Sequence, residues 1–122
     1  MRIVIQNHKD QYALSRRQVK ALHEMLPSFL WEKVQEFHLC DDHRRSEAFE
    51  YSATNKIVLF SFPVKEKTPS IVECAVQELL VGLARLRNNS EFFVPLRRQE
   101  REECQSFVEE WLPKCLETLS KL

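Results

Sequence analysis

The chain has 122 residues, a length typical of one domain with one hydrophobic core, and we expect a single domain over residues 1–122. Hydrophobic residues make up 43% and charged residues 30%, which indicates a folded globular protein rather than a disordered or membrane protein. The 18 Lys and Arg residues balance 18 Asp and Glu residues, which disfavours a nucleic-acid-binding protein because such proteins carry excess positive charge. Gly82 is the only glycine, so a glycine-rich phosphate-binding loop is excluded.

The sequence carries no sign of export or of membrane insertion. The N-terminus has one cation followed by three consecutive apolar residues, too few for a signal peptide. No apolar run approaches the roughly 20 residues that span a bilayer. We therefore expect a cytoplasmic protein without membrane contact, in which the four cysteines are reduced thiols. Three of them occupy apolar helix positions and are expected to be buried: Cys74, Cys104 and Cys115.

The first half of the chain reads as a strand, a helix and a second strand. Residues 2–6 alternate weakly and predict a short strand. Ser15 is expected to cap a helix, with Gln18 completing a capping box, and this helix carries one apolar face: Val19, Leu22, Met25 and Leu26. Pro27 interrupts the helix, and the alternation over residues 33–39 predicts the next strand.

Two further strands are expected in quick succession. A charged connection over residues 41–47 leads to a strand at 48–51, and a turn precedes the strongly β-prone run at 56–62. Strands joined by short links favour antiparallel pairing. We therefore predict an α+β fold, with a small, mainly antiparallel sheet of three to four strands packed on one face against three to four helices.

The best-marked helix begins with Thr68 as the capping residue and Pro69 at the first helical position, and it ends at residues 88–90. Its wide apolar stripe predicts packing over most of its girth: Ile71, Val72, Ala75, Val76, Leu79, Leu80, Leu83 and Leu86. Gly82 costs about 1 kcal/mol relative to alanine inside a helix. We therefore expect the backbone of a neighbouring element to approach it closely.

After a short extended piece at 92–94, a last helix is predicted from about Leu96, with Pro113 kinking or dividing it. One face of this helix is apolar: Cys104, Phe107, Trp111, Cys115, Leu119 and Leu122. The segment 97–103 mixes both signs of charge, which is typical of a solvated helix face with intrahelical ion pairs.

The segment Gln77-Glu78-Leu79-Leu80-Val81 lies on a helix that follows a strand, as the zinc helix of a minimal zincin metallopeptidase does. Over residues 15–87 the order of elements also resembles that family. Zincins hold Zn²⁺ with two histidines one helical turn apart, beside a glutamate that acts as general base. The resemblance matches that glutamate to Glu78, whereas Gln77 and Val81 replace the histidines. It therefore implies a zincin-like fold that has lost its metal. The other interpretation of Glu78 is an ordinary solvent-facing residue.

A second candidate site is a possible zinc site at His38, Cys40 and His43, since His38 and Cys40 share one face of a strand. The alternative is a strand end followed by a polar loop. Cys40 is also the only cysteine with cationic neighbours that could activate a thiol, although Asp41 and Asp42 oppose that effect. His23 begins no zinc motif, because Pro27 occupies the fourth position after it.

The leading functional hypothesis is a non-catalytic module that binds a protein partner or itself, with no cofactor and no assigned catalytic or metal-binding residue. The contact would be a sheet edge or, in a homodimer, the C-terminal helix if Leu112 and Leu116 lie off the core face. The alternative is a metal-dependent, peptidase-like hydrolase that uses Glu78 or the site at His38, Cys40 and His43.

Overall fold

A computed structural model describes residues 1–6, 12–40, 47–88 and 97–122. The fold is α+β, as predicted, with one four-stranded sheet and three α-helices in the described part of the chain. In chain order the elements are β1 (Arg2–Ile5), α1 (Arg16–Met25), the short 3₁₀ helix η1 (Ser28–Trp31), β2 (Glu36–Cys40), β3 (Phe49–Ser52), β4 (Ile57–Ser61), α2 (Pro69–Asn88) and α3 (Arg98–Ser120). The predicted extended piece at 92–94 lies outside the described residues.

The sheet is mixed, so the prediction of a mainly antiparallel sheet is wrong. Its strand order is β1-β2-β4-β3, in which β1, β2 and β4 run parallel to one another and β3 runs antiparallel to β4. Two features of the chain path explain this. Helix α1 carries the chain back between β1 and β2, which makes those strands parallel. Strand β4 then inserts between β2 and β3, so these two strands, which follow each other in the sequence, are not neighbours in the sheet.

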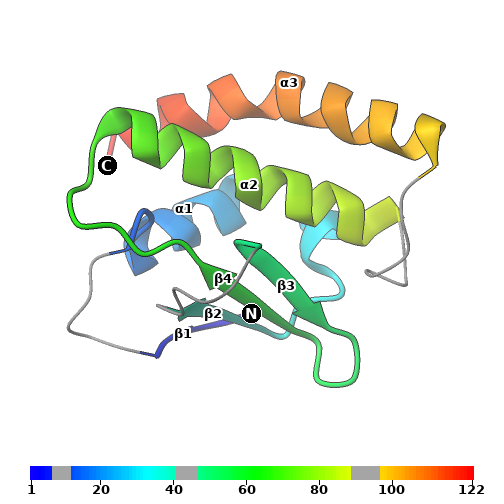
Figure 1. Ribbon diagram of the computed structural model, residues 1–122, viewed down its shortest axis with the longest axis horizontal. Coiled ribbons are helices and arrows are strands. Elements are labelled where there is room, and N and C mark those ends of the chain that lie inside the picture. The colour runs from blue at the N-terminus through cyan, green and yellow to red at the C-terminus, as the bar shows by residue number, and fades with distance from the viewer. Residues whose placement is uncertain (7–11, 41–46, 89–96) are drawn as a thin grey trace.

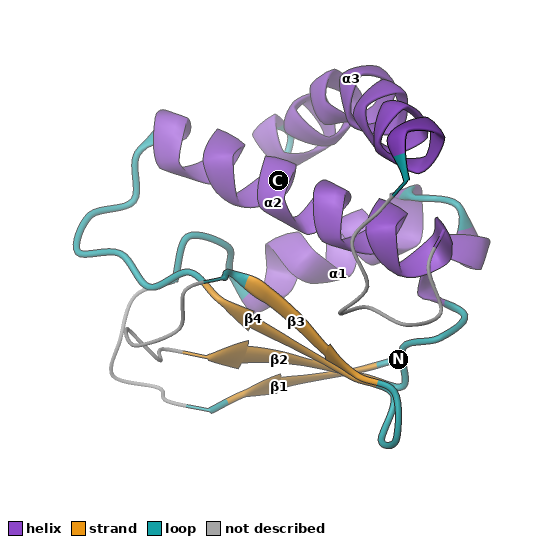
Figure 2. Cartoon of the chain, turned by 45° about the vertical axis from the view of Figure 1, so that its right-hand side comes forward, coloured by secondary structure: helices purple, strands orange, loops and turns teal. Residues whose placement is uncertain are grey.

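All three α-helices lie on one face of the sheet, as predicted (Figures 1 and 2). Helix α2 packs on β3, and α3 contacts both α2 and α1. Alternate strand residues point toward the helices and are buried: Phe37, Leu39, Phe49, Tyr51, Val58 and Phe60. They meet the apolar stripe of α2, of which Ala75, Val76, Leu79, Leu80, Leu83 and Leu86 are buried. This contact between sheet and helix forms the core.

Two predicted helix starts are confirmed. The backbone N–H of Gln18 donates to Ser15 Oγ at 3.2 Å, and the backbone N–H of Ser15 donates to Gln18 Oε1 at 2.9 Å. This reciprocal pair satisfies two N–H groups that have no partner within the helix. At the start of α2 the backbone N–H of Ile71 donates to Thr68 Oγ1 at 3.3 Å, and Pro69 is the first helical residue.

Helix α3 runs without a break from Arg98 to Ser120, so Pro113 does not divide it. Pro113 and Glu109 are both exposed, and water can therefore reach the Glu109 carbonyl whose helical hydrogen bond the proline removes. The predicted apolar face is correct for Cys104, Cys115 and Leu119, which are buried together with Val108. The expectation is wrong for Leu122, which is 46% exposed at the end of the chain.

Gly82 accommodates a side chain of β3, not a backbone. A Cβ atom built on Gly82 would lie only 2.3 Å from Cγ of Phe49. The ring of Phe49 therefore packs directly on the surface of α2, at the one position where the helix carries no side chain. This contact brings α2 close to β3 and positions the pocket described next.

Candidate binding pocket

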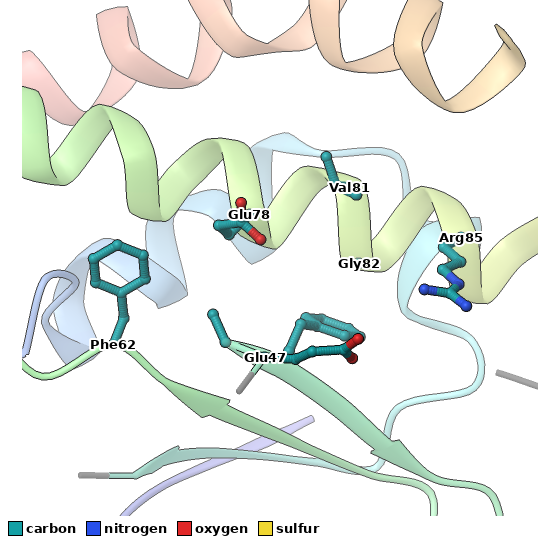
Figure 3. Close-up of a pocket in the computed structure, with 8 residues that line it drawn as sticks. Glu47, Phe62, Glu78, Val81, Gly82 and Arg85 are labelled. Carbon is teal, nitrogen blue, oxygen red and sulfur yellow. The ribbon is translucent and has the colours of Figure 1, made fainter. Parts of the chain in front are cut away.

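A pocket of about 380 Å³ opens between α2 and the adjoining ends of β3 and β4 (Figure 3). Its size lies near the lower end of the range for ligand sites. Eight of the described residues line it: Glu47, Ala48, Phe49, Phe62, Glu78, Val81, Gly82 and Arg85. In the view of Figure 3, Phe62 and Glu78 lie toward one end and Arg85 toward the other.

The local fold explains why these residues converge. Glu78, Val81, Gly82 and Arg85 are spaced by three or four residues, so they share one face of α2. The antiparallel pairing of β3 with β4 brings the start of β3 next to the end of β4, where the Ser61 N–H donates to the Ala48 carbonyl at 2.8 Å. Glu47 and Phe62 flank these strand ends and complete the pocket.

The pocket carries two carboxylates that are not paired within the described part of the chain. Neither Glu47 nor Glu78 has a hydrogen-bond or ion-pair partner there, and both side chains are exposed. Arg85, the one cation among the described lining residues, has an interaction of its own and is half-buried. The lining therefore presents two carboxylates to an incoming group.

The other described residues of the lining are apolar. The ring of Phe62 stacks on the buried ring of Phe60, with centroids 6.3 Å apart and planes 19° from parallel. Val81 is 39% exposed, one of few large apolar side chains that are so accessible in the described residues. Ala48 is half-buried beside them. The pocket thus combines an apolar wall with carboxylate groups.

The position of Glu78 bears directly on the zincin resemblance. Glu78 is exposed, as expected of an ordinary helix residue, and it also lines the pocket. Gln77 does not line this pocket and instead faces a second one between α2 and α3, together with Arg101 and Gln105. Val81 borders both. The structure therefore does not bring Gln77 and Glu78, which the resemblance places in one metal site, to the same cavity.

The structure describes only part of the metal site predicted in β2. His38 and Cys40 are close neighbours, and the Cys40 thiol donates to the His38 carbonyl at 3.6 Å. Both ring nitrogens of His38 are engaged, Nδ1 with Gln6 Nε2 at 3.0 Å and Nε2 with Glu36 Oε1 at 2.9 Å. The His38 hydrogen bond lowers the pKa of the Glu36 carboxyl. His43, Asp41 and Asp42 lie outside the described residues, and the remainder contains no cluster of three metal ligands.

The four cysteines divide differently from the prediction. Cys104 and Cys115 are buried, as expected, but Cys74 is exposed because it lies on the side of α2 turned away from the core. Cys40, the candidate for an activated and accessible thiol, is buried. The structure contradicts that candidate, because a nucleophilic thiol must be reachable by its substrate.

The exposure of the thiols predicts their reactivity. At about pH 8, we expect iodoacetamide to modify Cys74 in the folded protein well before the other three cysteines, because alkylation requires an accessible thiolate. Burial raises the pKa of the Cys115 thiol to about 11, which suppresses its thiolate further. Peptide mass spectrometry after timed alkylation measures the order, and the reaction in denaturant is the control. Equal rates for Cys74 and Cys115 in the folded protein would contradict this prediction.

His23 is half-buried on α1, with its ring edge-on to Trp31 at a centroid distance of 5.1 Å. Burial, followed by repulsion from the N-terminal ammonium group, lowers its pKa below the ordinary value of 6.5. The unfolded chain therefore binds a proton at His23 more tightly than the folded chain does. The contribution of neutral His23 to stability is fully present above pH 6.5 and is lost as the pH falls through its folded-state pKa.

We accordingly expect His23→Gln to reduce the loss of stability between pH 7 and about pH 5.5, measured by urea unfolding at each pH. His8, which lies outside the described residues, provides a matched variant, His8→Gln. Wild-type and His23→Gln curves that stay parallel over this range would show that His23 does not contribute.

The condition for a dimer through the C-terminal helix is not met. Leu112 and Leu116 are half-buried and pack against the core, so they do not lie off the core face. In the same helix, Arg98 pairs with Glu102 at 3.2 Å, which agrees with the intrahelical pairing predicted for the charged segment. Self-association stays a prediction, and Leu112 and Leu116 do not support it, because they pack against the core.

Comparisons with protein-family models, with curated proteins and with solved structures found no significant match. Within the described residues, no helix is both long enough and apolar enough to span a bilayer. The functional argument therefore depends on the pocket itself.

The sequence identified Glu78 as a candidate site residue but did not predict that Glu47, Phe62 and Arg85 would line the same pocket. The spacing of Glu78 and Arg85 could have indicated that they act together, since two residues seven positions apart share one face of a helix. Nothing in the sequence indicated that the start of one strand and the end of the next would lie opposite that face.

Proposed function

We propose that this chain is a non-catalytic protein-binding module that holds an extended segment of a partner protein at the pocket between α2 and β3. One observation carries the proposal: the pocket is open and partly apolar, and its carboxylates have no partner among the described residues. Apart from Glu47 and Glu78, its described lining includes no other side chain of the kinds that commonly serve as nucleophiles or proton carriers, namely serine, threonine, cysteine, histidine, lysine and tyrosine. A binding function needs none of them.

The position of the pocket, beside a strand at the edge of the described sheet, favours a chain segment as its ligand. A cavity of about 380 Å³ accepts one side chain with its adjoining backbone. The pocket also adjoins β3, which is at the edge of the described sheet, so a segment lying along this side of the domain would pass over the cavity. Accessible Val81 and the ring of Phe62 offer apolar surface to such a segment.

The test begins with a displayed library of random dodecapeptides, selected on the full chain. We expect selected peptides to shift the amide NMR signals of Val81 and Phe62 on titration. The Val81→Arg variant should bind these peptides about tenfold more weakly, because the new charged side chain fills the cavity. Ser70→Arg is the matched control, because Ser70 is exposed on the same helix and lines none of the pockets described here. Peptides that bind Val81→Arg as tightly as wild type would refute the proposal.

The alternative remains a metal-dependent, peptidase-like hydrolase, and one observation favours it: Glu78, the position matched to the zincin general base, lines a pocket. Native mass spectrometry of untagged protein tests it. One zinc per chain that is lost in a His38→Ala variant, or a peptidase activity that is lost in a Glu78→Gln variant, would support the hydrolase over the binding module. The resemblance to zincins is itself a hypothesis, and a zincin-like fold without its metal is compatible with the proposed binding function.

A further inference from the structure

The charge and shape of the pocket limit which side chain of a partner it can hold. Glu47 enters from the strand side and Glu78 from the helix side, so carboxylates border the cavity on both of its walls. Both are exposed and lack a partner in the described residues, and they outnumber Arg85, which is half-buried and has an interaction of its own. The formal charge of the described lining is therefore negative.

Each class of side chain meets this lining differently. An acidic side chain is repelled by the two carboxylates. A purely apolar side chain would displace water from Glu47 and Glu78 without replacing the lost hydrogen bonds. A lysine or arginine suits both the apolar and the acidic part of the lining. Its aliphatic stem packs on apolar groups while its charged end pairs with a carboxylate. Phe62 adds an aromatic ring that can contact the cation.

We infer that the pocket selects a basic side chain, a lysine or an arginine, from an extended segment of the partner protein. This inference rests on the proposed function and specifies its ligand. The stem of the basic side chain lies against Ala48, Val81 and Phe62. Its charged end is shared between Glu47 and Glu78, which replaces the water that both carboxylates lose.

The experiment uses the peptides selected on the full chain, and it pairs a change in the protein with a change in the peptide. Selected sequences should be enriched in lysine or arginine at one position. Replacing that residue with norleucine keeps the stem and removes the charge. We expect the norleucine peptide to bind wild type about tenfold or more weakly than the basic peptide does. The two peptides should bind the double variant Glu47→Gln/Glu78→Gln with similar affinity. Binding to wild type should also weaken as salt is added.

Glu24→Gln/Glu32→Gln is the matched control, because both residues are exposed, lie outside the pocket and change the net charge equally. It should bind the basic peptide as wild type does. If the two double variants lost the same amount of affinity for the basic peptide, the effect would come from long-range charge and not from the pocket, and the inference would be overturned. Peptides that require Val81 but carry no basic residue would overturn it while leaving the proposed function intact. If no selected peptide depends on Val81, the proposed function fails as well.

Discussion

Phe37→Ala is expected to lower the free energy of unfolding by about 3–5 kcal/mol, the cost of removing a fully buried aromatic side chain. Phe37 is 0% exposed on β2, a central strand of the sheet. Its ring contacts those of Trp31 and Phe60, with centroids 6.3 and 5.8 Å away. Truncation leaves a cavity among rings that the strand and η1 hold in place. A domain of this length has a total stability of roughly 6–18 kcal/mol, so the loss is a large fraction.

Urea unfolding followed by tryptophan fluorescence measures this effect, because Trp31 lies beside the changed residue. Phe29→Ala is the matched control, since Phe29 is 41% exposed and its main contact is the Arg87 guanidinium, 4.1 Å from the ring centroid. Exposed cation–π pairs contribute about 0.5–1 kcal/mol, so the control should cost far less. Similar losses in the two variants would contradict the assignment of Phe37 to the centre of the core.

Local signals in the sequence predicted the helices better than the sheet. The capping box at Ser15 and the pair Thr68-Pro69 are determined by neighbouring residues, so the sequence alone marks where these helices begin. The sheet depends on contacts between segments far apart. Short links between β2, β3 and β4 are equally compatible with a meander and with insertion of β4 between the other two strands. Periodicity shows which face of a strand is buried, not which strands are neighbours, so it does not decide between them.

The candidate site was predictable only where one helix supplies it. Glu78 and Arg85 share a face of α2 at a spacing that is visible in the sequence. Glu47 lies at the end of the predicted charged connection, before β3, but its place opposite α2 follows from the register of β3 with β4, which the sequence does not show. The same holds for Gly82. Its cost in a helix indicated a close approach, but only the structure identifies the Phe49 ring as the approaching group.

Gly82→Ala is expected to destabilise the protein by about 1–3 kcal/mol, although the same change in an ordinary helix interior stabilises by about 1 kcal/mol. The new methyl group would lie 2.3 Å from Cγ of Phe49, so the ring must move. The ring is 5% exposed between α2 and β3, and it therefore has little free space to enter. The sign of the effect is diagnostic, because helix propensity and packing act in opposite directions. Thermal or urea unfolding provides the measurement.

A double-mutant cycle with Phe49→Ala separates packing from propensity. Phe49→Ala alone should cost about 3–5 kcal/mol, as a buried aromatic residue does. In that background the clash is absent, and Gly82→Ala should then be neutral or stabilising by up to about 1 kcal/mol. If Gly82→Ala destabilises both backgrounds equally, the Phe49 ring is not the cause. If it stabilises wild type, the close contact between β3 and α2 does not exist, and the wall of the pocket that depends on it would be lost from the proposal.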